Sequence, residues 1–266
     1  MEFVDCHTHT RYSDGSGSVW ENVEAAAKLG LTTLCLTDHL TLPTSMDPSC
    51  EVSVAERDLA PYRLEVVQAR EAFPALDVVL GFECDYYPGC EPNVARWSEG
   101  ATFRLGSVHM LDGRWIDDLS DLSYWEEHST EAVWRRYFEV WAQACQSPCG
   151  FDSMAHPDLV SLLGRLPSAT VLEGLYDTAA EAAEAAGVRI EVNTAGLIKP
   201  VGHIYPAPGL LERFLKAGVR ATVGSDAHVP HRVGEGIADA YRLLYESGYR
   251  SIDVPTAQGG WRRVEL

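Results

Sequence analysis

The 266-residue sequence lacks a long apolar run, a basic leader segment and any run of Lys and Arg. Its apolar stretches stay far below the roughly 20 residues that a membrane span needs, so we expect no membrane association. The chain starts directly with a strand-like segment and without the features of a secretory signal, which predicts a cytoplasmic location.

Basic residues are scarce: 21 Lys and Arg stand against 39 Asp and Glu, which gives a formal net charge of −18. Such a field repels a polyphosphate backbone, and no local basic patch offsets it, so we expect no nucleic-acid partner. Bound cations would offset part of this charge.

Cysteine supplies no paired motif, because the seven cysteines include no C-x-x-C spacing. In a cytoplasmic protein an odd number of cysteines indicates free thiols. Cys6 and Cys84 lie close to candidate metal ligands in the sequence, and we interpret both as core residues.

What the sequence contains is an alternation of short apolar segments and longer helical patterns. The predicted strands are 2–6, 33–37, 77–82, 103–108, 151–155, 188–192 and 220–224. The predicted helices are 19–29, a long one within 54–72, 130–145, 169–186, 209–217 and 237–247. This order predicts an α/β fold with a parallel sheet, and the number of units favours a distorted, TIM-like (β/α)7 barrel made by residues 1–266 as a single domain. An eighth segment, 250–254, could close the barrel.

Histidine is concentrated at the ends of these strands. In an extended segment His7 and His9 point the same way and can face one metal ion. Six of the nine histidines end or directly follow a predicted strand: His7, His9, His39, His109, His156 and His228. Strand ends converge on one rim of a parallel barrel, whereas core histidines have no reason to collect there. We therefore expect a metal site at the C-terminal ends of the strands.

Carboxylates accompany these histidines. Glu83 ends the third strand, Asp226 follows the seventh, and Asp14 lies in the loop after the first. Mixed imidazole and carboxylate ligands suit zinc, iron or manganese. Asp14 could instead form an Asx turn or cap the next helix.

This pattern resembles the PHP (polymerase and histidinol phosphatase) phosphoesterase family, from residue 5 to residue 228. The family's four motifs and its further ligands are matched by His7-Thr8-His9, Thr37-Asp38-His39, His109, Ser225-Asp226-Ala227-His228, Glu83 and His156-Pro157-Asp158. The resemblance implies a distorted barrel and a trinuclear site of divalent ions. By this resemblance the three ligand sets are His7, His9, Glu83 and Asp226; Glu83, His109 and His156; and His39, His228 and Asp14.

The chemistry implied is hydrolysis of a phosphate monoester, in which a water that bridges two ions loses a proton and attacks phosphorus. Glu83, Asp226 and His228 are the candidate catalytic residues. The proton for the leaving group could come from metal-bound water, from His228 or from an adjacent acid. Arg165 and Lys199 are the candidates for binding the substrate's phosphate.

Within the family, the chain length and the segment from Glu191 to Gly196 resemble the stand-alone members that hydrolyse L-histidinol phosphate in histidine biosynthesis. That small substrate carries an ammonium and an imidazole beside its phosphate. Acidic and aromatic side chains in the loops after the strands could complement these groups. The candidates are Asp85, Glu91, Asp158, Tyr12, Tyr86, Tyr87 and Trp115.

Several alternatives stay open at this point. The same site could act on a nucleotide or another small phosphate ester, or the chain could bind metal without catalysis, although degenerate proteins usually lose ligands. A metal-dependent amidohydrolase also opens with His-x-His, but that class generally needs a later lysine, and no predicted strand ends in one. Metal identity and oligomeric state are left open.

Overall fold

The structure, a computed structural model, describes residues 2–266. Within that range seven strands pair in sequence order, each parallel to the next. They are β1 (Val4–Asp5), β2 (Thr33–Leu36), β3 (Asp77–Asp85), β4 (Phe103–Ser107), β7 (Ser153–Met154), β8 (Arg189–Asn193) and β9 (Ala221–Gly224).

The first and last of these strands lie side by side. The backbone N–H of Cys6 donates to the carbonyl of Val223 at 2.9 Å, and the N–H of Asp226 donates to the carbonyl of His7 at 2.8 Å. An isolated parallel bridge joins Thr8 to Ala227. The sheet is therefore a nearly closed barrel, and the predicted fold class is confirmed.

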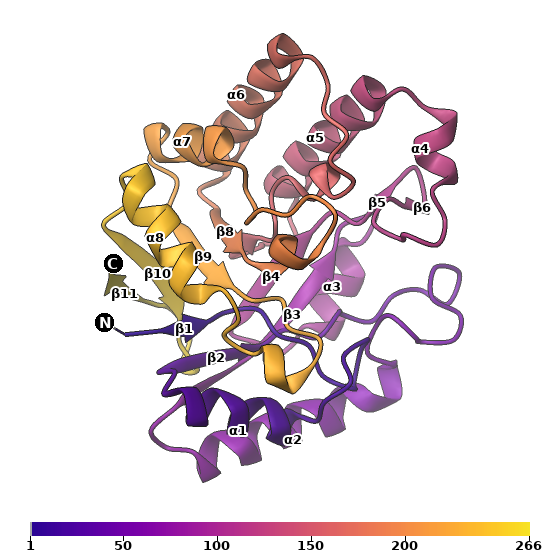
Figure 1. The fold of residues 1–266 in the computed structure, drawn as a ribbon. Helices are drawn as coiled ribbons and strands as arrows, with labels where there is room; N and C mark the ends of the chain where they lie inside the picture. The colour runs from indigo at the N-terminus through magenta and orange to yellow at the C-terminus, as the bar shows by residue number, and fades with distance from the viewer. Residues whose placement is uncertain (1) are drawn as a thin grey trace.

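Helices form an outer layer around the strands (Figure 1). The long ones are α1 (Val19–Leu29), α2 (Leu59–Ala72), α5 (Thr130–Gln146), α6 (Ala169–Ala186), α7 (Pro208–Lys216) and α8 (Ile237–Ser247). Each agrees with its predicted range. Ser18 begins α1 with a capping box to Glu21, and Gly30 ends it in the left-handed conformation at φ 72°, so local sequence fixes both ends.

The connections between the barrel strands, and the one after β9, contain short elements that the sequence pattern did not predict. They are α3 (Glu91–Trp97), α4 (Ser123–Glu127), the antiparallel pair β5 (Met110–Leu111) and β6 (Arg114–Trp115), and the 3-10 turns η1 (Glu56–Asp58), η2 (Leu159–Ser161), η3 (Ala195–Ile198) and η4 (Pro230–Arg232). They are too short to show a helical or strand period.

The prediction that segment 250–254 closes the barrel is wrong. That segment is β10 (Ser251–Pro255), which pairs antiparallel with β11 (Trp261–Glu265) in a separate two-stranded sheet. The hairpin contacts the beginnings of barrel strands: Arg189 pairs with Asp253 at 2.8 Å, and the rings of Phe103 and Trp261 lie 5.9 Å apart. The hairpin therefore covers the N-terminal end of the barrel.

One cluster of buried apolar side chains fills the barrel and the space beneath the helices. Trp134 and Trp141 of α5 are among its largest fully buried members. In residues 2–266 all seven cysteines are free thiols, and Cys6 and Cys84 are buried in this core, as predicted. No helix in the described range has the length and apolar character that crossing a membrane requires.

Candidate metal centre

The nine predicted metal ligands meet at the carboxyl ends of the strands. Their donor atoms fall into overlapping groups whose members lie within 4.8 Å of one another. These groups are His7, His9 and Asp226; Glu83, His109 and His156; and His9, Asp14, His39 and His228. A further group, which joins Asp85 to His39 and His109, was not predicted.

Glu83, at the end region of β3, lies between two pairs of histidines. Its Oε2 is 3.1 Å from His7 Nε2 and 3.3 Å from His9 Nε2. Its Oε1 is 3.1 Å from His156 Nε2 and 3.6 Å from His109 Nε2. The side chain is 1% exposed. His39 Nε2 also lies 3.4 Å from Oε2. With one oxygen toward His7 and His9 and the other toward His109 and His156, this carboxylate could bridge two ions.

His7 and His9 converge as alternate residues of an extended segment should. Their Nε2 atoms are 2.9 Å apart, and Asp226 Oδ1 lies 3.5 Å from the first and 3.3 Å from the second. Asp226 has a positive φ of 56°, and His156 one of 23°. Such angles strain a residue with a side chain, and strain of this kind clusters at functional sites.

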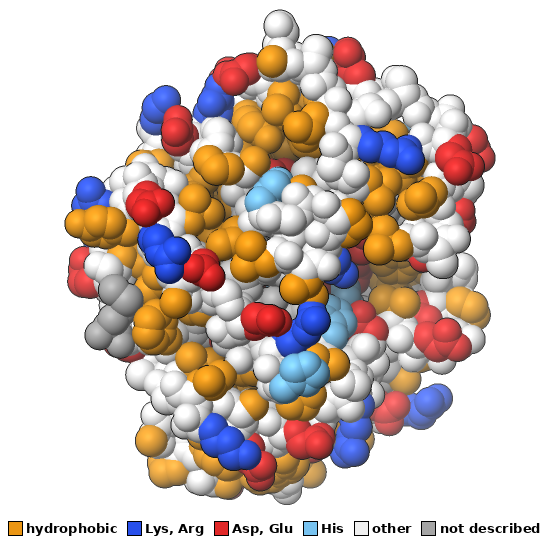
Figure 2. Space-filling model, in the orientation of Figure 1, with side chains coloured by type: hydrophobic (Ala, Val, Ile, Leu, Met, Phe, Trp, Pro, Cys, Tyr) orange, Lys and Arg blue, Asp and Glu red, His pale blue; other side chains and the backbone are white. Residues whose placement is uncertain are grey.

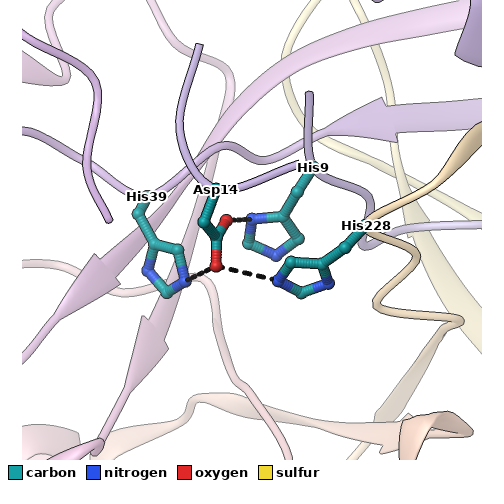
Figure 3. Close-up of side chains that lie close together, drawn as sticks. All are labelled: His9, Asp14, His39 and His228. Atoms are coloured by element: carbon teal, nitrogen blue, oxygen red, sulfur yellow. Dashed lines mark hydrogen bonds and ion pairs between the residues drawn. The ribbon is translucent and has the colours of Figure 1, made fainter. Parts of the chain in front are cut away.

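Asp14 lies between His39, which follows β2, and His228, which follows β9 (Figure 3). Its Oδ2 is 3.1 Å from His228 Nε2 and 3.9 Å from His39 Nε2, and its Oδ1 is 3.4 Å from His9 Nδ1. The cap of α1 is Ser18, so the carboxylate of Asp14 is not used as that helix cap. This group is the most open part of the centre, with His228 39% and Asp14 30% exposed.

Two further carboxylates orient the imidazole rings. Asp85 accepts from Nδ1 of both His39 and His109, at 3.0 and 2.6 Å, and Glu191 lies 2.8 Å from Nδ1 of His7. These contacts leave the Nε2 atoms free to face a metal ion. Sequence reasoning placed Asp85 on an acidic rim, but the side chain is buried. The available signal was strand alternation, because Asp85 lies two residues after Glu83 and points to the same face.

A glycine makes room for one of these contacts. A Cβ at Gly224 would collide with the carboxylate of Glu191 and with the side chain of His7.

Asp38, the neighbour of His39, holds a loop in place. Its Oδ1 accepts from the Thr10 backbone N–H at 2.8 Å and from the Ser13 hydroxyl at 2.7 Å. It thereby fixes the segment that carries Asp14.

The histidines and carboxylates of the candidate metal centre shift one another's pKa values strongly. Burial alone would lower the pKa of His39 and of His109, but nearby carboxylates, Glu83 foremost, raise the pKa of the first to about 9 and of the second to about 10. Burial would raise the pKa of Glu83, but His39 and His7 hold it well below its ordinary range. The donor set is thus an array of carboxylates whose charge is balanced by protonated imidazoles. Divalent ions fit it because they supply the same positive charge at the same atoms.

The two predicted phosphate-binding residues lie in different surroundings. Lys199, at the end of η3, lines a cavity together with Glu83, Asp226 and His228. The guanidinium of Arg165 lies 5.9 Å from the ring centroid of Trp125, and Arg165 does not line the cavity that Lys199 shares with Glu83. Figure 2 shows histidine side chains in and beside a hollow in the middle of this face.

The side chains predicted to complement the substrate are mostly engaged elsewhere. Asp158 is buried and accepts from the Ala207 backbone N–H at 2.9 Å, and the Tyr12 hydroxyl donates to Glu65 at 2.8 Å. Tyr86 and Tyr87 line a separate cavity, and Glu91 begins α3. Trp115 is the exception, because it lines a cavity with His39 and His109.

Comparison with known proteins identifies the family. The PHP domain model matches residues 5–195. A Deinococcus radiodurans protein named "Probable histidinol-phosphatase" is 32% identical over 93% of this chain and 95% of its own length. A Thermotoga maritima protein of the same name is 24% identical over 94% of this chain and 95% of its own length.

Among solved structures, a histidinol phosphate phosphatase from Lactococcus lactis, complexed with zinc, L-histidinol and phosphate, superposes with a TM-score of 0.81. The two sequences are 20% identical, and the match covers 96% of this chain and 97% of the other. At this identity the likeness concerns the fold.

Proposed function

The chain belongs to the PHP domain family, and on that premise we propose that it is a metal-dependent phosphomonoesterase that hydrolyses L-histidinol phosphate to L-histidinol and phosphate. The observation that carries the proposal is Glu83, whose two oxygens each face a separate pair of histidines. The names of the relatives support the substrate. The cytoplasmic location and the single-domain organisation stay predictions.

The proposed centre holds three ions. Their ligands are the three predicted sets, with Glu83 shared between the first two: His7, His9, Glu83 and Asp226; Glu83, His109 and His156; and His39, His228 and Asp14. Zinc, manganese and iron all suit these donors. When bound, such ions polarise phosphoryl oxygens and lower the pKa of water.

Residues of the chain orient the ligand rings and bind the substrate's phosphate. Asp85 and Glu191 hold the rings of His39, His109 and His7 by their Nδ1 atoms, so the donor nitrogens keep their direction. Lys199 carries a flexible positive charge on the wall of the central cavity, where it can bind a phosphoryl oxygen.

The test is phosphate release from a panel of L-histidinol phosphate, mononucleotides and sugar phosphates, with the metal content measured on the same sample. We expect L-histidinol phosphate to be preferred by at least about tenfold in kcat/KM, about 1.4 kcal/mol of transition-state discrimination. Preference for another ester would overturn the substrate but keep the phosphatase. Absence of activity with zinc or manganese supplied would overturn both.

A further inference from the structure

Two cysteines outside the metal centre have their sulfur atoms in contact. The Sγ atoms of Cys90 and Cys149 are 3.5 Å apart, although the residues are 59 positions apart in the sequence. A disulfide needs about 2.05 Å between its sulfurs, so a gap of about 1.5 Å remains to be closed. Within residues 2–266 neither thiol belongs to a group that could hold a metal ion. The pair is therefore a candidate for chemistry separate from that of the metal centre.

The barrel holds the two thiols against each other through β4. Cys90 follows β3 and Cys149 precedes β7, and β4 pairs with both of these strands. Shortly before Cys90, the backbone N–H of Tyr86 donates to the carbonyl of the last β4 residue at 2.8 Å. Shortly after Cys149, the N–H of Asp152 donates to another β4 carbonyl at 2.8 Å. The fold thus brings the thiols together before any bond forms between them.

The two thiols differ in access and in acidity. Cys90 is 0% exposed, whereas Cys149 is 8% exposed and lies in a turn between the exposed residues Pro148 and Gly150. A hydrogen bond from the Cys90 thiol lowers the pKa of the Cys149 thiol, and the same contact raises the pKa of Cys90. The thiolate is the form that attacks an oxidant. Cys149 is therefore placed to react first, and Cys90 to attack the product.

We propose that Cys90 and Cys149 form a modification site, at which hydrogen peroxide converts the two thiols reversibly into a disulfide that cross-links the strand connections on either side of β4. The closed loop contains α3, β4, β5, β6, α4 and α5. Closing a loop of this length removes freedom from the unfolded chain, so the oxidised protein should be the more stable form. Because the pair lies outside the metal centre, its oxidation can be tested separately from the proposed phosphatase function.

The oxidation takes place in two steps. The Cys149 thiolate attacks one oxygen of the peroxide, the O–O bond breaks, and a sulfenic acid forms on Cys149. The departing hydroxide takes the proton that Cys149 released and becomes water. The Cys90 sulfur then attacks the Cys149 sulfur, the S–O bond breaks, and the hydroxyl group leaves with the Cys90 proton as a second water. Two thiols are oxidised to one disulfide while one peroxide is reduced to two waters.

The test treats the zinc-loaded protein with hydrogen peroxide, blocks the remaining thiols with iodoacetamide and maps disulfides by mass spectrometry without reduction. Zinc is used because it has no redox chemistry of its own. We expect a linked peptide that joins Cys90 to Cys149, and recovery of both thiols with a phosphine reductant. The melting temperature should rise by about 5–15 °C on oxidation and fall back on reduction.

Single variants separate the two roles. Cys90→Ser keeps the attacking thiol, so peroxide should leave Cys149 as a sulfenic acid that dimedone traps. Cys149→Ser should leave Cys90 unmodified under the same conditions, and neither variant should show the rise in melting temperature. Cys145→Ser is the matched control, because Cys145 is another buried thiol, near the end of α5. It should form the disulfide as wild type does.

Recovery of both cysteines as thiols from folded, peroxide-treated wild type would overturn the proposal. A disulfide that joins either one to Cys50 instead would do the same. A Cys90–Cys149 disulfide without a higher melting temperature would overturn its role as a stabilising cross-link. These readouts need no turnover, so they hold whether or not the protein hydrolyses L-histidinol phosphate.

Discussion

Glu83 and Asp14 are both acidic side chains among histidines, but they occupy different positions. Glu83 is 1% exposed and faces two pairs of imidazoles through separate oxygens. Asp14 is 30% exposed and lies in a loop at the open edge of the centre. A bridging carboxylate serves two ions, whereas a terminal one serves a single ion.

This difference predicts unequal losses. Glu83→Gln should lower kcat/KM by at least about a hundredfold and reduce the bound metal, because a carboxamide has one acceptor oxygen and no charge. Asp14→Asn should cost less in both readouts and leave the other two ions in place. Kinetics and metal analysis on the same preparations check this. Equal losses in the two variants would contradict the bridging role.

At this scale the sequence identified side chains that the fold brings together, but not the contacts that support them. Each ligand could be found because it ends or follows a strand, and a strand end has a fixed place in a barrel. Asp85 was misplaced because a buried carboxylate on a strand looks like a rim residue until the ring it orients is located. Asp117 lies in a loop without any period, so only the folded structure shows that it lines a cavity with His109.

At the scale of secondary-structure elements, the C-terminal hairpin is the part whose role the sequence did not predict. Its pairing is antiparallel, and it covers the N-terminal end of the barrel, away from the metal ligands. Asp253 of β10 is 5% exposed. Its Oδ2 forms an ion pair with Nε of Arg189, at the start of β8, at 2.8 Å. The Arg189 guanidinium also lies 3.4 Å from the ring centroid of Trp261.

Breaking that buried pair should destabilise the fold without touching the chemistry. Asp253→Asn leaves a buried guanidinium without its counter-charge, so we expect the free energy of unfolding to fall by about 3–5 kcal/mol. Asp239→Asn removes a solvent-exposed partner of Arg242 and should cost about 1 kcal/mol or less. Urea unfolding of the metal-loaded protein checks both. A large drop in kcat at low temperature for Asp253→Asn would show that the hairpin also supports the site.

The element boundaries show what periodicity can and cannot predict. The long helices were predicted because each buries one face. In α1, Ser18 and Glu21 also form the N-terminal capping box, and Gly30 caps the C-terminus. The short elements α3, α4, β5 and β6 were missed because two to seven residues carry no measurable period. The segment that forms β10 was expected to join the barrel, since nothing local distinguishes an antiparallel strand of five residues from a barrel strand.

At the scale of the whole molecule, the net charge of −18 includes several carboxylates gathered at one rim. Without ions, protonated imidazoles balance part of this negative charge. Barrel topology was predictable from the order of strands and helices, whereas closure depends on the β1–β9 contact between distant ends of the chain.

This balance predicts how the metal-free protein responds to pH. The pKa is raised to about 9 for His39 and to about 10 for His109, above the ordinary value of about 6.5 in the unfolded chain. Their stabilising contribution is therefore complete below about pH 6.5 and is lost as pH rises through 9 to 10. We expect urea unfolding of chelator-treated protein to show falling stability across this window.

His109→Gln provides the control, because its metal-free form should lose less stability over the same range. Stability that stays flat or rises between pH 7 and pH 9 in wild type would contradict the charge balance described for the centre.

The most direct measurement is phosphate release from L-histidinol phosphate by protein that has been stripped of metal and then titrated with zinc or manganese. We expect no release from the stripped protein, and activity that rises with added metal and levels off near about three equivalents per chain. Full activity in the stripped protein, or none at any metal ratio, would contradict a metal-dependent phosphatase built on this rim.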